Sequence, residues 1–229
     1  MDQKTLKTKI DSATAARGKG DLKESRLMFE KLLKGFEQIP EEKRTKEFQF
    51  LYATAQAEYV IQHRLEAKEL YSKALGLGKE LLEYDKENKI NNPLSLRSVS
   101  NTLVDLQSYE KAIHYLNKLI MLHKNNSASR GDTRAHLAYC LLRSGQVKKA
   151  ETEMKVAKQE ILENSTGEGY ITIKHSYVLL VEALILNAKG YSSKALSRAH
   201  ESFKVARSKS RVFRMKQAQE VMDYLKDKV

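Results

Sequence analysis

The sequence predicts an all-α protein built as an array of helical hairpins, and three observations support this. The 229 residues include only two prolines and ten glycines, so few positions interrupt a helix. No strand-like alternation of apolar and polar residues persists beyond a few positions. One spacing of a turn, a small residue and a bulky residue returns five times along the chain. We expect residues 1–229 to form a single repeat domain.

The repeated pattern is a polar or glycine turn, then a small residue, then a bulky residue four positions later. It occurs in GKGDLKESRLMFEKLL, QHRLEAKELYSKAL, LQSYEKAIHYLNKL, RSGQVKKAETEMKVA and AKGYSSKALSRAHES. The small residues, separated by 42, 45, 38 and 45 positions, are Ser25, Ala67, Ala112, Ala150 and Ala195. A small side chain early in a second helix lets the first helix approach closely. The space one turn further on is expected to be filled by Phe29, Tyr71, Leu116 and Met154.

Each element follows from this pattern. Gly20, Gly145 and Gly190 fall where a first helix ends, a place that favours a residue with positive φ. The expected helix pairs are 3–17 with 21–38, 42–62 with 65–85, 93–106 with 109–123, 130–144 with 147–163, and 170–188 with 192–208. Polar joints are expected at 84–93, 124–132 and 163–170. A last helix within 210–228 should cover the remaining apolar face through Val212, Met215, Ala218, Val221, Met222 and Leu225.

These segments resemble tetratricopeptide repeats (TPR). The resemblance is clearest at Gly145, Val147, Ala150 and Met154, and the first helices keep a small residue at Ala55, Ser100, Ala138 and Ala183. The usual period of about 34 residues is stretched here to about 42, as in the long-helix variety of kinesin light chains and Gram-positive peptide-sensing regulators. The resemblance implies a right-handed α-solenoid of about five TPR-like hairpins plus a C-terminal capping helix. A HEAT or armadillo array, with a period of about 40–47 residues, is the alternative.

The net charge of +12 is concentrated in the second half of the chain. Residues 1–115 hold 20 basic and 18 acidic residues, a net charge of +2, and residues 116–229 hold 21 and 11, a net charge of +10. The basic residues of interest are Lys204, Arg207, Lys209, Arg211, Arg214 and Lys216. This segment fits three interpretations: a solvated helix face, a surface for an acidic protein, or a site for nucleic acid or anionic lipid.

No motif points to catalysis, to a cofactor or to a metal. The chain lacks GxxxxGK[ST], GxGxxG, HExxH and GxSxG. His136 and Cys140 are four positions apart, but two ligands do not complete a zinc site. The N-terminus lacks a signal-peptide core, and the most apolar run, 177–188, contains Glu182 and is too short to span a membrane. We therefore expect a non-enzymatic cytoplasmic protein without membrane insertion.

The concave side of such an array, lined by the first helices, is the expected binding surface. The stripe at helical spacing comprises Tyr52, Gln56, Tyr59, Arg97, Asn101, Asp105, His136, Tyr139, Arg143, Tyr177, Leu180 and Asn187. Such side chains suit a peptide or protein partner, including an acidic one. Arg97 with Asn101 resembles half of the carboxylate clamp of some TPR domains. The predicted function is a protein- or peptide-binding scaffold. The alternatives are a nucleic-acid or polyanion binder acting through the basic segment, and a peptide-responsive regulator.

Overall fold

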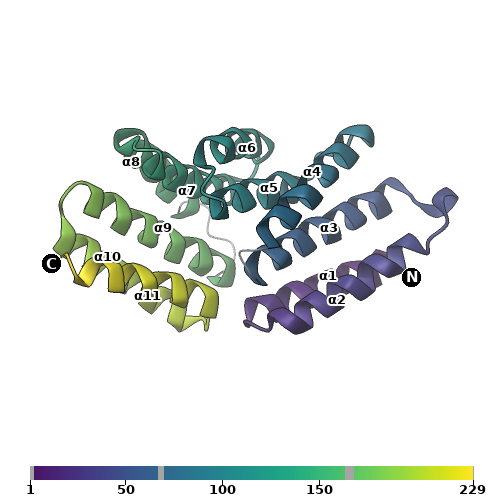
Figure 1. The fold of residues 1–229 in the computed structure, drawn as a ribbon, viewed down its shortest axis with the longest axis horizontal. Helices are drawn as coiled ribbons and strands as arrows, with labels where there is room; N and C mark the ends of the chain where they lie inside the picture. The colour runs from purple at the N-terminus through teal and green to yellow at the C-terminus, as the bar shows by residue number, and fades with distance from the viewer. Residues whose placement is uncertain (1–2, 67–69, 163–167, 229) are drawn as a thin grey trace. The chain divides into compact units, whose positions relative to one another are not determined.

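The computed structural model describes residues 3–66, 70–162 and 168–228, which form eleven α-helices and one short 3₁₀-helix, Glu41–Lys43 (Figure 1). The α-helices are α1 (Gln3–Gly18), α2 (Leu22–Glu37), α3 (Lys46–Glu66), α4 (Tyr71–Glu87), α5 (Pro93–Asp105), α6 (Tyr109–Leu122), α7 (Ser127–Arg143), α8 (Val147–Leu162), α9 (Glu168–Ala188), α10 (Ser192–Ser208) and α11 (Val212–Lys226). These residues contain no strand, so the predicted all-α class is confirmed.

The helices form two compact units, residues 1–115 and 116–229, and the boundary between them falls within α6. In the first unit, α1 packs on α2 and α3 packs on α4, while α1, α3 and α5 lie next to one another. In the second unit, α7 packs on α8 and α9 on α10, while α7, α9 and α11 adjoin in the same way. We call these odd-numbered helices the first helices and the even-numbered ones the second helices. The surface formed by adjoining first helices is the inner face of its unit.

Four hairpins share one turn geometry. Gly20, Gly145 and Gly190 have φ values of 91°, 77° and 84°, as the sequence predicted. In these three hairpins the residue after the glycine donates its N–H to a carbonyl five positions earlier, for example Gln146 to Leu141 at 2.8 Å. This bond pattern satisfies carbonyls that the end of the first helix leaves without a partner.

Gln107 takes the same turn position between α5 and α6 without being glycine. Its φ is 56°, and Ser108 donates its N–H to the carbonyl of Leu103 at 2.8 Å. The left-handed conformation costs a residue with a Cβ about 1–2 kcal/mol relative to the right-handed one. The turn at Gln107 is therefore imposed by the packing of the hairpin and not by local preference.

The small residues lie at the crossing of the two helices of their hairpins, as expected. Ser25, Ala112, Ala150 and Ala195 are completely buried, and each is the fourth residue of its second helix. The Ser25 hydroxyl donates to the carbonyl of Ala13 at 2.8 Å, so its polarity is satisfied inside the core. The bulky residues one turn on, Phe29, Leu116 and Met154, are also buried.

The second hairpin differs from its predicted register. The structure continues α3 to Glu66 and begins α4 at Tyr71, so the expected boundaries at 62 and 65 are wrong. The fourth residue of α4 is Ala74, which is completely buried, whereas Ala67 lies outside the described residues. Tyr71 is half-buried at the helix start and does not fill the crossing. Four positions after Ala74, Gly78 provides the close contact, since a Cβ there would lie 2.7 Å from Val99 Cγ2.

Local capping explains two further shifts in helix starts. Helix α3 begins at Lys46 instead of residue 42, because Pro40 and the 3₁₀-helix precede it and the Thr45 hydroxyl accepts the N–H of Phe48 at 3.3 Å. Helix α7 begins at Ser127 instead of residue 130, because the Asn126 side chain accepts the N–H of Ser129 at 2.9 Å. Asparagine and threonine at these positions satisfy N–H groups of the first turn that have no partner within the helix.

Helix α11 packs on the last hairpin. Ala218, Met222 and Leu225 are buried against α9 and α10, with Val221 beside them. The prediction of a covering helix is confirmed for these four residues. It is wrong for Val212, which is 37% exposed at the helix start.

Two glycine-to-alanine substitutions distinguish the energetic cost of a left-handed backbone from the cost of a steric clash. At Gly145 and at Gly76 within α4, an added Cβ would meet no atom within 4 Å, but only Gly145 has positive φ. We predict that Gly145→Ala lowers the free energy of unfolding by about 1–2 kcal/mol, whereas Gly76→Ala raises it by about 0.5–1 kcal/mol. Urea denaturation followed by circular dichroism measures both. Equal effects of the two variants would contradict the turn geometry.

Candidate functional site

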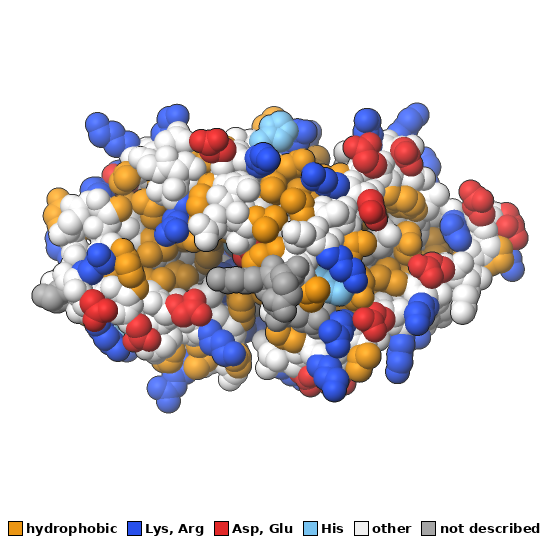
Figure 2. All heavy atoms as spheres, viewed as in Figure 1, with side chains coloured by type: hydrophobic (Ala, Val, Ile, Leu, Met, Phe, Trp, Pro, Cys, Tyr) orange, Lys and Arg blue, Asp and Glu red, His pale blue; other side chains and the backbone are white. Residues whose placement is uncertain are grey.

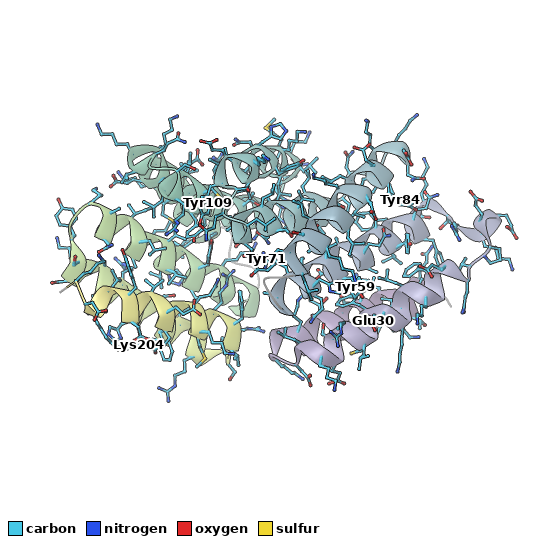
Figure 3. All side chains as sticks on the ribbon, viewed as in Figure 1. Glu30, Tyr59, Tyr71, Tyr84, Tyr109 and Lys204 are labelled. Atoms are coloured by element: carbon cyan, nitrogen blue, oxygen red, sulfur yellow. The ribbon has the colours of Figure 1, made fainter. Side chains whose placement is uncertain are left out.

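The predicted stripe on α3 does not lie on the inner face. The Tyr52 ring contacts Phe36 of α2 and Tyr84 of α4, with centroids 5.3 Å and 5.9 Å apart. The Tyr59 hydroxyl donates to Glu30 of α2 at 3.2 Å, and Figure 3 shows these two side chains between α2 and α3. Gln56 lies between them in sequence on the same side of the helix, and its buried Oε1 accepts no hydrogen bond from the residues that the structure describes. The assignment of these three residues to the inner face is therefore wrong.

Tyr52 instead forms one wall of a pocket of about 210 Å³ on the side of the second helices. Phe36, Phe48 and Tyr84 are its other aromatic walls, and Glu37 and Arg44 are among its lining residues. Burial raises the pKa of the Tyr52 hydroxyl, and Glu37 adds to this effect while Arg44 opposes it. Burial also raises the pKa of Tyr84.

The inner side of α3 is the opposite one. Phe50 precedes Tyr52 by two positions, which on an α-helix is a rotation of about 200°. Phe50 and Leu51 line a hollow with residues of α1, and Glu58 pairs with Arg17 of α1. Arg17 also donates to the Glu58 carbonyl at 2.9 Å. The inner stripe of α3 is therefore Phe50, Thr54, Glu58 and Ile61.

A second ion pair joins α3 to α5. Arg64 Nε lies 3.1 Å from Asp105 Oδ2, and the two side chains are 13% and 27% exposed. Burial lowers the pKa of Arg64, and Asp105 opposes this while the nearby Arg17 and Arg97 add to it. Burial raises the pKa of Asp105, which Arg64 partly offsets. Three guanidinium groups from α1, α3 and α5 thus lie near one another in the first unit, and two of them pair with carboxylates.

Two of the three predicted residues of α5 belong to this cluster. Arg97 is half-buried and close enough to influence Arg64, and Asp105 pairs with Arg64. Asn101 is buried, with 8% of its surface exposed. The sequence pattern missed Arg17, Glu58 and Arg64.

The second unit carries a stack of three side chains, one from each first helix. His136 of α7 stacks on Tyr177 of α9, with centroids 4.2 Å apart and planes inclined by 24°. The guanidinium carbon of Arg214, from α11, lies 4.3 Å from the centroid of the same tyrosine ring. Cation–π contacts of this kind contribute about 0.5–2 kcal/mol. Since the stack joins α7, α9 and α11, it belongs to the inner face of its unit.

The remaining predicted residues of this unit have different surroundings. Tyr139 is half-buried on α7, and Arg143 is exposed as the last residue of that helix. Leu180 is buried in α9. Asn187 accepts a hydrogen bond from the Ser192 hydroxyl at 3.4 Å, which ties it to the turn before α10.

The predicted basic patch does not behave as one group. Lys204, Arg207 and Lys209 are exposed at the end of α10, and Lys216 is exposed on α11. Arg211 is half-buried at the start of α11, and Arg214 belongs to the stack. Figure 2 shows basic side chains interspersed with acidic ones on the face drawn there.

The comparisons with known proteins address the fold. No family model matches the chain, and no curated protein matches it. Among solved structures, the TPR-like repeats of a chain described as a Podosopora anserina kinesin light chain match with a TM-score of 0.59 at 13% identity, covering 90% of this chain and 98% of that one. TTC0263, a thermophilic TPR protein of Thermus thermophilus, matches with a TM-score of 0.59 at 17% identity, covering 93% and 98%. The apo form of RapI matches with a TM-score of 0.61 at 12% identity, covering 100% and 85%.

The chain has the TPR fold. Its long period therefore reflects long helices within TPR-like hairpins, and the HEAT or armadillo alternative is not needed. Among the described helices of this TPR array, none combines the length and apolar character of a membrane-spanning segment. Within the same residues, no three side chains of metal-binding type gather at one place.

The single cysteine, Cys140, is buried in the core. Cys140 lies in α7 with its side chain fully buried, and burial raises its pKa to about 12. The reactive form of cysteine is the thiolate, so this thiol is protonated and inert at neutral pH.

Thiol labelling at pH 8 tests this placement. We predict that Cys140 of the native chain reacts with an aromatic disulfide reagent at least about 100-fold more slowly than in the denatured chain, where its pKa returns to about 8.5. Complete labelling of native protein at the rate of the denatured protein would contradict the buried position.

Proposed function

We propose that the chain is a non-enzymatic scaffold that binds a peptide or protein partner along the inner faces of its TPR-like hairpins. The observation that carries the proposal is the makeup of these faces. Adjoining first helices present arginine–carboxylate pairs in the first unit and a histidine–tyrosine–arginine stack in the second. Planar guanidinium and aromatic groups held in place by neighbours lose little conformational entropy on binding.

The charge around Arg64 favours a partner with carboxylate groups. Arg17 and Arg97 lie close enough to Arg64 for their charges to lower its pKa, so three guanidinium groups repel one another here. A partner carboxylate would relieve the repulsion among the three guanidinium groups.

The proposal places the action of the chain in the cytoplasm. Its single cysteine cannot form a disulfide within the chain, which fits a reducing compartment.

Two alternatives keep specific support. NprR of B. thuringiensis, a quorum sensor, matches with a TM-score of 0.54 at 14% identity, which favours a regulator that responds to a bound ligand.

The other alternative, a polyanion binder, is favoured by three exposed basic residues that form no ion pair within the described residues: Lys204, Arg207 and Lys216. The C-terminal turn of α10 also suits basic residues without any ligand, because cations stabilise the helix dipole there.

Peptide selection tests the scaffold proposal. A random peptide library displayed on phage is selected against the full chain, and selected peptides are titrated by fluorescence anisotropy. We expect acidic peptides whose dissociation constant rises about tenfold or more with Arg97→Glu, since this removes one favourable charge contact and adds a repulsive one.

Lys111→Glu is the matched control, because it makes the same charge change on an exposed position of second helix α6. It should leave the affinity within about twofold. Failure to select any peptide, or equal losses with the two variants, would overturn the proposal. Binding of a labelled oligonucleotide that is lost with Lys204→Glu and depends steeply on salt would favour the polyanion alternative.

A further inference from the structure

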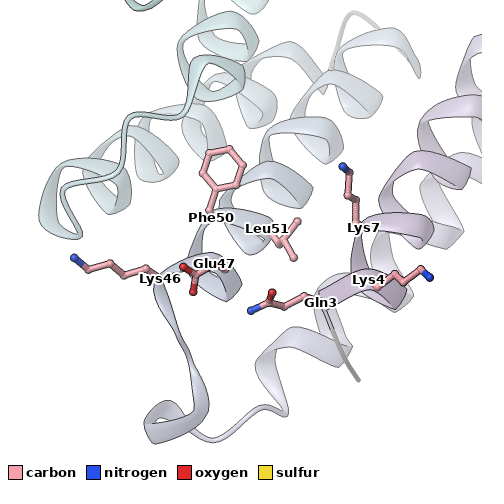
Figure 4. A pocket seen from close by; sticks show the side chains of 7 residues that line it. All are labelled: Gln3, Lys4, Lys7, Lys46, Glu47, Phe50 and Leu51. Atoms are coloured by element: carbon pink, nitrogen blue, oxygen red, sulfur yellow. The ribbon is translucent and has the colours of Figure 1, made fainter.

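A shallow hollow of about 570 Å³ lies between the first turns of α1 and α3 on the inner face of the first unit. Lys4 and Lys7 line it from α1, and Lys46, Glu47, Phe50 and Leu51 line it from α3. Figure 4 shows the Leu51 and Gln3 side chains directed into the gap between the two helices, while Lys4 and Lys46 extend away on either side.

The floor of the hollow is apolar, and the Phe50 ring that lines it is open to solvent. Leu51 packs against the core formed by α1 and α2, which fixes the start of α3 in place. Phe50 is 43% exposed although it belongs to a first helix whose neighbouring residues are packed. Burying an exposed phenylalanine against another apolar side chain is favourable, and this ring is held ready for such a contact.

The rim of the hollow is positively charged. Lys4, Lys7 and Lys46 are exposed and form no ion pair within the described residues. Lys4 and Lys46 lie in the first turns of their helices, where the helix dipole disfavours cations, and the first turn of α1 has no acidic residue. The carboxylate of Glu47 accepts hydrogen bonds from its own backbone N–H and from the Thr45 hydroxyl, which lower its pKa, and the charge of Lys46 lowers it as well. Lysines therefore dominate the electrostatics of this rim.

We infer that the hollow binds an acidic segment of a partner protein that places one apolar side chain against Phe50 and its flanking carboxylates near Lys4, Lys7 and Lys46. This rests on the proposed scaffold function and gives the chemistry of the partner at one end of the inner face. Carboxylates would relieve both the mutual repulsion of the lysines and their unfavourable interaction with the helix dipoles.

The same features argue against a nucleic-acid strand as the occupant. Oligonucleotide sites combine basic residues with several rings on which successive bases stack. Here Phe50 is the one ring among the described residues that line the hollow, and its neighbour Leu51 is aliphatic. The one exposed ring of Phe50 between flanking lysines has room for one apolar side chain of a peptide with acidic residues on either side.

Fluorescence anisotropy on the full chain tests the site. The probe is a labelled peptide with one phenylalanine between two pairs of aspartates, and a second peptide replaces that phenylalanine by alanine. We expect the dissociation constant of the probe to rise about tenfold or more with the Lys4→Glu/Lys46→Glu variant, because two attractive charge contacts become repulsive. Phe50→Ala should weaken the probe several-fold and leave the alanine peptide unchanged.

The matched control is Lys31→Glu/Lys34→Glu, which reverses two exposed charges on second helix α2 of the same unit. It should retain the affinity of the unmodified chain, and circular dichroism should show native helicity for every variant. Affinities equal to that of the unmodified chain in both site variants would overturn the inference, as would tighter binding of a single-stranded oligonucleotide with the same sensitivity to the variants. If peptides selected by phage display still bind the Lys4→Glu/Lys46→Glu variant at full affinity, this site is excluded while the scaffold function stands.

Discussion

The close approach of the two helices within each hairpin is the constraint on which the rest of this structure depends. A residue without a large side chain lies fourth in each second helix, and Ala112, Ala150 and Ala195 show the arrangement most plainly. The left-handed turn before it fixes where the second helix begins, because the anchor N–H bonds the residue that follows the turn, as from Ala150 to Gln146 at 3.0 Å. Turn and anchor together set the rotation of both helices. They therefore decide which side chains of a first helix reach the inner face.

The sequence was sufficient for most of the fold because this constraint leaves a visible spacing. Where a glycine turn and its alanine stood together, as at Gly145 and Ala150, the predicted helix boundaries on the two sides of the turn were correct to within a residue. The turn at Gln107 had no glycine, yet the hairpin was found from Ala112 alone. At the second hairpin the longer α3 shifted the true anchor to Ala74, a displacement that spacing alone could not detect.

The main error in the candidate site is the rotation of α3. The polar and aromatic stripe of Tyr52 and Tyr59 was assigned to the inner face, although it packs against second helices. The displacement of the anchor by seven positions does not explain this, because seven residues are close to two full helical turns and select the same face. The α5 residues, counted from the correct Ala112, reached the charge cluster through Asp105. The stack of His136, Tyr177 and Arg214 could not be derived from sequence, since it joins residues 78 positions apart on three helices. Its arginine was counted with the basic segment because composition does not show the direction of a side chain.

The stability of a variant with a crowded crossing tests the central constraint most directly. Ala150→Leu adds three carbons at the contact of α7 with α8, whereas Thr152→Leu adds apolar volume on the exposed side of the same helix. Chemical denaturation should show that Ala150→Leu lowers the free energy of unfolding by about 1–3 kcal/mol, and that Thr152→Leu changes it by less than about 0.5 kcal/mol. An Ala150→Leu variant as stable as the unmodified chain would contradict the claim that close helix contact sets the fold and the inner face.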